Sequence, residues 1–225
     1  MTIWFASGNI HKKEELASIL SCAVQKNAAG PKSPAFELKI PGEAGLYFDP
    51  DEKGNSFLEN VLIKAEELYR LLAETRNQDV CHHVIADGHM IIADDSGLCV
   101  DALGGRPGIH SARYGGKDLG AAEKNALLLK ELGDNPVRSA RFVCAMALYY
   151  GPDRFFVAQE CMEGELVKDP SLVRGSGGFG YDPILYIPEL GRTVAELSPE
   201  EKNLLSHRGK AARAIASILF KLGSY

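Results

Sequence analysis

The sequence predicts a mixed α/β fold, with long strands in a sheet and helices packed around it. Apolar runs of strand length alternate with longer segments whose apolar residues recur at helical spacing, and Gly- and Pro-rich turns separate them. One run, 141–150, is apolar almost throughout, which is typical of a central strand covered on both faces. The 225 residues suffice for one large domain, and neither a repeat nor a clear linker divides residues 1–225.

The N-terminal segment is expected to form a strand, a turn and a helix. The apolar run 3–6 predicts the strand, and apolar residues on one face of 13–20 predict the helix. A stretch rich in Pro and Gly, 22–54, follows, with one strand expected at 36–40.

A long helix is expected after this stretch. Ser56 and Glu59 form a capping box, and apolar residues recur at helical spacing from there to Leu72. Two short strands are then expected at 84–86 and 89–93, joined by an Asp-Gly turn.

The second half of the chain is expected to alternate helices and strands. A helix over 120–132 ends at a glycine, and the central strand 141–150 pairs with 155–165 after a Gly-Pro-Asp turn. A strand at 184–187 and a last helix over 199–222 complete the prediction.

Composition excludes several classes of protein. The net charge of −5 gives no general attraction to nucleic acid or anionic lipid, so basic residues must act locally on any polyanion. No segment approaches the roughly 20 apolar residues that span a bilayer, and the N-terminus lacks the regions of a signal peptide. The five cysteines are at positions 22, 81, 99, 144 and 161. Their number is odd and they form no CxxC pair, which indicates reduced, cytoplasmic usage.

The segment Asp94-Asp95-Ser96-Gly97 is the most informative motif. It lies between two apolar runs, 90–93 and 98–100, and two adjacent carboxylates at the end of a buried strand are costly unless a cation neutralises them. Oxygen ligands followed by a small hydroxyl and a glycine suit Mg²⁺ held beside a phosphate. A polar hairpin turn is the alternative, because Asp, Ser and Gly are all common turn residues.

The glycine-rich segment 175–180 formally matches GxGxxG, but a strand follows it where the dinucleotide fingerprint needs a helix. We therefore reject that interpretation. The glycines let backbone approach a ligand closely, and Phe179 and Tyr181 add aromatic surface, so the loop suits a flat ligand such as a base. A glycine-rich surface turn with one buried aromatic is the alternative.

Three other site patterns fail. Residues 49–60 resemble a calcium loop but lack its final bidentate Glu. Standard zinc spacing is absent around Cys81-His82-His83 with Asp87 and His89, and the chain has no P-loop sequence.

Two basic segments could bind an anion. Ser7 to Lys12 lies between a strand and a helix N-terminus, where free amides and the helix dipole favour negative charge. Ser206-His207-Arg208 is expected on the last helix, with Lys202 about one turn earlier. An ordinary solvated helix face is the alternative for the second segment.

Five blocks, separated but in order, run from Ser7 to Arg208. They are Ser7-Gly8-Asn9 with Lys12 and Glu15; Phe57-Leu58-Glu59-Asn60 with Lys64-Ala65; Ala93 to Leu98 running into Gly104 to Gly108 and Ser111 to Tyr114; Gly177 to Pro183; and Glu201-Lys202 with Ser206-His207-Arg208. Together they resemble the inosine triphosphate pyrophosphatase family, enzymes that remove deaminated purine nucleotides. The segments 22–54 and 74–89 depart from the family pattern, the second as an extension.

The resemblance implies a single domain whose elongated mixed sheet and flanking helices form two lobes, without a linker, around a nucleotide cleft. It also implies a homodimer. The net charge, the cysteine usage and the lack of a long apolar segment separately predict a cytoplasmic protein with no nucleic-acid or membrane partner. The reaction would be Mg²⁺-dependent hydrolysis of ITP, dITP or XTP to the monophosphate and pyrophosphate. Two alternatives stay open: a pyrophosphatase for other modified or pyrimidine nucleotides, and a module that binds nucleotides without hydrolysis.

The resemblance also implies roles for particular residues. Asp95 would be metal ligand and general base, with Glu52, or alternatively Glu43, as the second metal ligand. A donor from His207 or Arg208 would recognise the six-oxygen of the base. The residues expected to bind substrate are Ser7, Gly8, Asn9, Ile10, His11, Lys12, Ser96, Phe179, Gly180, Tyr181, Asp182, Lys202, His207 and Arg208.

Overall fold

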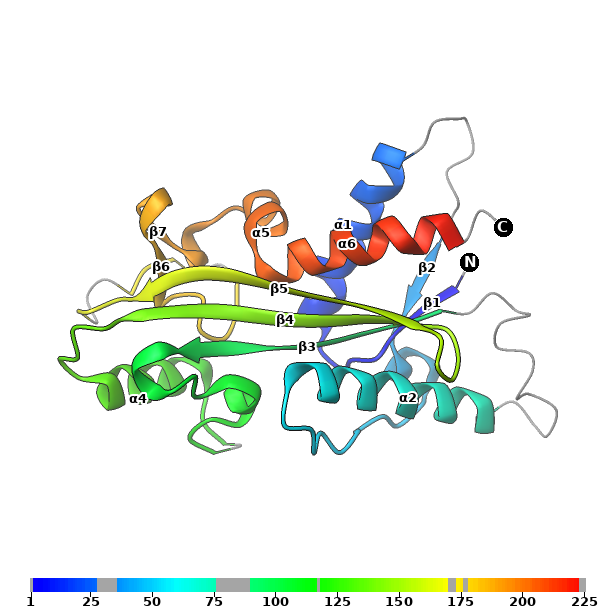
Figure 1. Cartoon of the computed structure of the whole chain (residues 1–225), viewed down its shortest axis with the longest axis horizontal. Helices are drawn as coiled ribbons and strands as arrows, with labels where there is room; N and C mark the ends of the chain where they lie inside the picture. Colours follow the sequence, from blue (N-terminus) through cyan, green and yellow to red (C-terminus); the bar gives the residue numbers. More distant parts are fainter. Residues whose placement is uncertain are drawn as a thin grey trace. The chain divides into compact units, whose positions relative to one another are not determined.

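The computed structural model describes residues 2–27, 36–75, 90–116, 118–169, 173–175 and 178–222. These residues form a seven-stranded mixed sheet with flanking helices, which confirms the predicted fold class (Figure 1). The strand order is β2-β1-β3-β4-β5-β6-β7; β1 runs parallel to β2 and β3, whereas β6 is antiparallel to both β5 and β7. The strands are β1 Thr2–Phe5, β2 Glu37–Lys39, β3 Met90–Val100, β4 Ser139–Tyr149, β5 Phe155–Leu166, β6 Leu185–Ile187 and β7 Arg192–Thr193.

The α-helices lie close to the segments with helical periodicity. They are α1 Ile10–Asn27, α2 Phe57–Thr75, α4 Ala121–Leu132, α5 Pro199–Leu205 and α6 His207–Leu222. At the start of α2, the Ser56 hydroxyl accepts a hydrogen bond from the Glu59 amide at 3.1 Å, and the Glu59 carboxylate accepts one from the Asn55 amide. The predicted cap therefore forms, with its second bond shifted by one residue.

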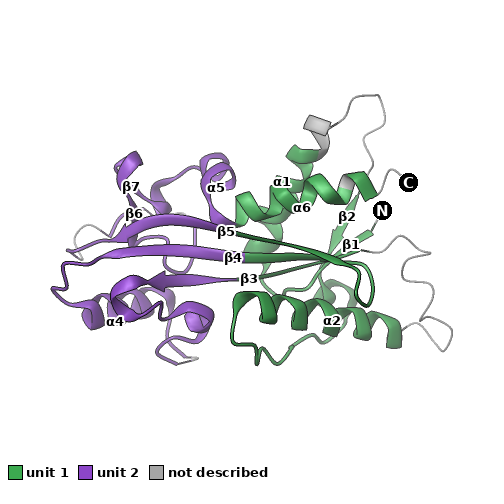
Figure 2. Cartoon of the chain, viewed as in Figure 1, with its two compact units in different colours: residues 1–95, 145–159, 208–225 green, residues 96–144, 160–207 purple. Residues whose placement is uncertain are grey.

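The chain divides into two compact units, and β3, β4 and β5 each contribute residues to both (Figure 2). Unit 1 comprises 1–95, 145–159 and 208–225. In unit 1, α2 packs on one face of the sheet, where Val61 and Leu68 contact the inward side chains Trp4 and Ile91. Alternate strand residues point the other way; α1 and α6 cover that opposite face (Figure 1).

Unit 2 comprises 96–144 and 160–207 and has its own core. Leu128 and Leu132 of α4 pack there with Leu98 of β3 and Phe142 of β4. From Phe142 onward β4 is buried, as expected of a central strand, whereas at its beginning Ala140 is buried and Ser139 and Arg141 are half-buried.

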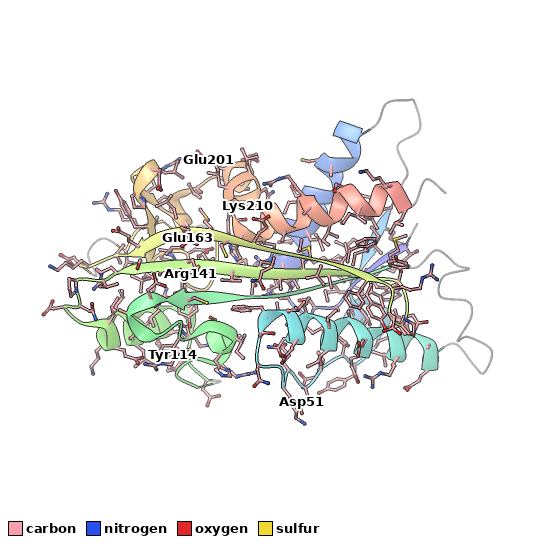
Figure 3. All side chains as sticks on the ribbon, in the orientation of Figure 1. Asp51, Tyr114, Arg141, Glu163, Glu201 and Lys210 are labelled. Atoms are coloured by element: carbon pink, nitrogen blue, oxygen red, sulfur yellow. The ribbon has the colours of Figure 1, made fainter. Side chains whose placement is uncertain are left out.

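Arg141, near the beginning of β4, carries an exposed ion-pair network within unit 2. Its guanidinium lies 2.9 Å from Asp101 and 3.6 Å from Glu163 of β5. Figure 3 labels Arg141 and Glu163. Exposed pairs of this kind add little stability.

Two local expectations were wrong. The acidic motif does not end a strand: β3 continues unbroken through Asp94 and Asp95 to Val100. The last helix is not continuous, because Ser206 is extended (φ −68°, ψ 156°) and separates α5 from α6. Lys202 and His207 therefore belong to different helices.

Some expectations lie outside the described residues. These are the strand at 84–86, the zinc alternative with its residues 81–83, 87 and 89, and part of the glycine-rich segment, 176–177. Among the residues that are described, Cys22, Cys99, Cys144 and Cys161 form no disulfide bond. Within the same part of the chain, each helix is too short or too polar to cross a lipid bilayer.

Candidate active site

Asp94 and Asp95 lie mid-strand in β3 and point to opposite faces of the sheet in unit 1. Both side chains are almost fully buried, at 1% and 6% exposure. Successive strand residues alternate between faces, so Asp95 shares the α2 face with Ala93, while Asp94 shares the face covered by α1 and α6. The partners that each carboxylate finds come from the helices on its own face.

Asp94 joins α1 to α6. Its Oδ1 accepts a hydrogen bond from Lys12 Nζ at 3.0 Å, and its Oδ2 accepts one from Arg208 Nε at 3.1 Å. Arg208, only 3% exposed, also donates to Glu15 at 2.7 Å. Burial alone would raise the pKa of Asp94, but the charges of Lys12, Arg208 and Lys64 outweigh it and hold that pKa well below its usual range.

Asp95 instead faces α2. Lys64 Nζ lies 3.0 Å from Asp95 Oδ1 and 3.0 Å from Glu52 Oε1, so one ammonium joins two carboxylates. Asn60 donates to Asp95 Oδ2 at 3.2 Å. Burial raises the pKa of Asp95 above its ordinary value; Lys64 opposes this and Glu52 adds to it. The adjacent carboxyl groups thus have pKa values shifted in opposite directions.

The segment Ser7 to Lys12 caps α1. The Asn9 side-chain oxygen accepts hydrogen bonds from the amides of His11 and Lys12 at 3.0 and 3.3 Å, and Ser7 Oγ accepts one from the Asn9 amide at 3.1 Å. Gly8, Asn9, Ile10 and His11 are exposed, and nothing lies within 4 Å of a Cβ placed on Gly8. The positive end of an 18-residue helix is therefore open to an anion beside the Lys12 ammonium.

Glu43, the alternative second acid, has a different environment in unit 1. Its carboxylate pairs with Lys13 and accepts the Ile40 amide. The bond to Lys13 is the main reason that the pKa of Glu43 is lowered. Glu52, in contrast, shares Lys64 with Asp95.

In unit 2, the loop 178–182 is built around a buried ion pair. Lys202 Nζ donates to Asp182 Oδ2 at 2.9 Å, and both side chains are almost fully buried. The same oxygen accepts the Phe179 amide at 2.8 Å, and the Lys202 ammonium lies 4.6 Å from the Phe179 ring centroid. An aromatic ring thus lies beside a cation whose charge is locally balanced.

Tyr181 anchors this loop. Its ring is 6% exposed, and its hydroxyl donates to the Ser111 carbonyl at 2.9 Å. Burial raises the pKa of Tyr181 to about 12. The Ser111 hydroxyl in turn accepts the Leu98 amide at 2.9 Å and donates to the Gly108 carbonyl at 2.6 Å. A hydrogen-bonded chain therefore joins the loop to the continuation of β3.

His207 and Ser96 complete the predicted set. His207, 6% exposed, stacks on Phe142 with ring centroids 4.8 Å apart. Ser96 is half-buried on β3, directly after Asp95.

Comparison with known proteins identifies the family. The sequence model of the Ham1 family matches residues 3–218, nearly the whole chain. The chain belongs to the Ham1 family.

Several Ham1 relatives carry the same name. A Treponema denticola protein named dITP/XTP pyrophosphatase is 40% identical over 222 residues, covering 97% of this chain and 98% of the relative. A Xylella fastidiosa protein of the same name is 39% identical over 218 residues, covering 95% and 94%.

Solved Ham1 structures have the same fold. The Staphylococcus aureus Ham1 protein is 33% identical, with a TM-score of 0.75 over 99% of this chain and 100% of that one. A Coxiella burnetii HAM1 protein is 34% identical, with a TM-score of 0.77 over 98% and 99%.

Sequence reasoning did not assign site roles to several residues that hold this Ham1 cluster together. Lys64 and Asn60 belong to a block that carries the resemblance, and Glu15 to another. A signal for Lys64 and Asn60 was available, because they lie four residues apart and so on one face of α2. Nothing comparable in the sequence indicates that Asp94 binds α1 and α6 rather than a ligand.

Proposed function

We propose that this chain hydrolyses deaminated purine nucleoside triphosphates, ITP, dITP and XTP, to the monophosphate and pyrophosphate. The names of relatives that align over nearly the whole chain support this activity. The observation that carries the proposal is the arrangement of Asp94 and Asp95. The Asp94 carboxylate binds Lys12 and Arg208. The Asp95 carboxylate shares the Lys64 ammonium with Glu52.

The phosphates would bind at the N-terminus of α1. A triphosphate is a polyanion, and the dipole of α1 at the exposed segment 8–11, together with the Lys12 ammonium, provides positive charge for it. The hydrogen bond from Lys12 to Asp94 holds the ammonium in place, and the Asp94 carboxylate does not itself occupy the helix N-terminus. This arrangement stabilises negative charge that develops on the departing pyrophosphate.

The donor set fits Mg²⁺ with Asp95 and Glu52 as its protein ligands. Their carboxylates already converge on one cation, the Lys64 ammonium, and carboxylate oxygens are the ligands Mg²⁺ prefers. Within the described residues, three or more acidic, His or Cys side chains nowhere gather into a metal site. Two carboxylates suit Mg²⁺, which usually keeps waters and substrate phosphates as its remaining ligands. When bound, the ion would neutralise charge on the phosphates and the leaving group.

Asp95 is the proposed general base. Asn60 and Lys64 hold its two oxygens from α2, which fixes the carboxylate in one orientation. A fixed carboxylate can accept a proton from the water that attacks the α-phosphorus, so no covalent intermediate is needed. Lys64, held between the acids, limits their mutual repulsion.

The base would bind at the loop 178–182 in unit 2. The Phe179 ring offers a stacking surface, and Lys202 keeps a positive charge beside it. Hypoxanthine and xanthine present an oxygen at the purine six position where adenine presents an amine, so a donor from His207, which belongs to the same unit, would favour the deaminated bases. Sites built on such hydrogen bonds can discriminate by about 10⁴ or more.

Pyrophosphate release tests the proposal directly. The purified chain is incubated with ITP, dITP, XTP, ATP, GTP and dUTP at equal concentration, with Mg²⁺ and with excess chelator. We expect release from the deaminated purines alone, and only with Mg²⁺. Faster turnover of dUTP or another pyrimidine would favour the related pyrophosphatase, and nucleotide binding without release would favour a binding module.

The homodimer and the cytoplasmic location are part of the same proposal. The homodimer rests on the family resemblance, and the cytoplasmic location rests on the reduced cysteine usage. Light scattering after gel filtration should give twice the chain mass of 24.4 kDa. A monomer at micromolar concentration would remove the dimer from the proposal and leave the activity untouched.

A further inference from the structure

Asn125 of α4 is a buried polar residue outside every motif discussed above. It is 6% exposed, and its Nδ2 donates to the Gly180 carbonyl at 3.1 Å. Its Oδ1 has no hydrogen-bond partner among the described residues. A buried amide atom without a partner costs free energy, and an apolar side chain would avoid that cost. What the amide gains at this position is its bond to Gly180.

That bond holds an otherwise adaptable loop. Gly178 and Gly180 flank Phe179 with φ of +73° and +64°, and glycine is the residue with the most conformational freedom to lose. Two bonds fix the dipeptide between them. The Phe179 amide donates to Asp182, and the Gly180 carbonyl accepts from Asn125. With both ends held, the backbone of Phe179, and hence its ring beside Lys202, has one position.

We propose that Asn125 is a positioning residue for base selection: by holding the Gly180 carbonyl, it fixes the Phe179 ring on which the purine stacks. This inference rests on the proposed function. A purine that stacks on a displaced ring presents its six position at a displaced point, where donors no longer match an oxygen. Asn125 thereby contributes to the preference for ITP over ATP without touching the nucleotide.

The test is Asn125→Leu, which keeps a similar volume, removes the donor and adds no buried charge. We expect KM for ITP to rise about tenfold with kcat within about twofold, because a displaced ring weakens stacking of the base by about 1.4 kcal/mol and leaves the phosphate chemistry unchanged. The ratio of kcat/KM for ITP over ATP should fall, while the thermal midpoint stays at or above that of the parent chain. Asn125→Ala, which also lacks the donor, should change KM and the ratio in the same direction, and it carries the test if the Leu variant misfolds.

Leu129→Ala is the matched control, because Leu129 lies one turn further along α4 and packs on the unit 2 core. It should lower the thermal midpoint and leave KM and the ITP to ATP ratio unchanged. Parental KM and ratio in both Asn125 variants would overturn the inference, as would a KM effect of equal size in Leu129→Ala. If the parent chain releases no pyrophosphate, the proposed function fails. The inference is then tested by calorimetry, as the ratio of the dissociation constants of ATP and ITP in the parent chain and in the Asn125 variants.

Discussion

The buried polar clusters of the two units differ in how they balance charge. In unit 1, Asp94 and Asp95 meet Lys12, Lys64 and Arg208, and Glu15 and Glu52 extend the network. In unit 2, one ion pair, Asp182 with Lys202, lies beside an aromatic ring and hydrogen-bonded backbone.

The difference matches the chemistry proposed for each cluster. Several charges taken out of water need several partners, and such a network suits a polyanion and a divalent cation. A single pair against aromatic surface suits a flat, neutral base, whose recognition depends on ring position and a few donors.

Asp95→Asn should have the largest effect on turnover. The amide keeps the shape of the side chain and removes both the base and the negative metal ligand, so we expect kcat for ITP to fall by about 10³-fold or more. KM should change far less. Circular dichroism and the thermal midpoint check that the chain stays folded. Asp101→Asn, in the exposed network of unit 2, is the control and should turn over at the parental rate.

Arg208→Met should have the largest effect on stability. It removes the guanidinium that pairs with both Glu15 and Asp94, and breaking a buried ion pair costs about 3–5 kcal/mol. Urea unfolding measures the change. Arg192→Met removes an ion pair with Glu201 that is roughly 40% exposed, and its unfolding midpoint should barely move. Equal destabilisation by both variants would contradict the distinction between buried and exposed networks.

Most of the fold follows from local sequence signals. The long helices and central strands were predictable because their apolar residues recur at helical spacing or run without interruption, and the capping box at Ser56 marks the start of α2. The continuation of β3 through Asp94 and Asp95 was not. Local propensity favours a turn there, and only cations from distant helices make two buried carboxylates acceptable within a strand.

Most residues of the site could be predicted from sequence motifs, but the contacts among them could not. The blocks placed Asp95, Lys12 and Arg208 in one predicted set, but Lys12 and Arg208 pair with Asp94, which points to the face of β3 opposite Asp95. Which helix covers each face decides these pairs, and no local pattern reveals it. The break at Ser206 escaped prediction because the apolar spacing continues from α5 into α6. Asn125 carries no local signal at all: an Asn within a helix is usually read as a surface residue.

Lys202→Arg should affect base selection more than turnover. A guanidinium keeps the charge but is larger and planar, so it cannot hold the ammonium's place between Asp182 and the Phe179 ring. We expect KM for ITP to rise by up to about tenfold, equivalent to about 1.4 kcal/mol of binding, with little change in kcat. Steady-state kinetics with ITP and ATP provide the measurement. A drop in kcat at constant KM would place Lys202 with the phosphate chemistry and break the proposed division.

Tyr181→Phe should have the smallest effect, visible mainly at alkaline pH. The folded-state pKa of Tyr181 is about 12, above the ordinary value of about 10, because burial disfavours the phenolate. Between these values the unfolded chain loses the proton and the folded chain keeps it, so stability present below about pH 10 declines as the pH rises. The Phe variant loses about 1 kcal/mol at neutral pH with its bond to Ser111. The free energy of unfolding of the Phe variant should then decline less steeply from pH 10 to 12 than that of the parent chain.

The comparison needs urea unfolding at several alkaline pH values. Tyr114 and Tyr149 also have raised pKa values, so the variant should reduce the decline without abolishing it. Parallel stability curves for the two proteins would mean that the Tyr181 hydroxyl reaches water in solution. In that case the hydrogen-bonded chain from the loop 178–182 through Ser111 to β3 does not hold the loop, and the fixed Phe179 ring must depend on Asn125 and Asp182 alone.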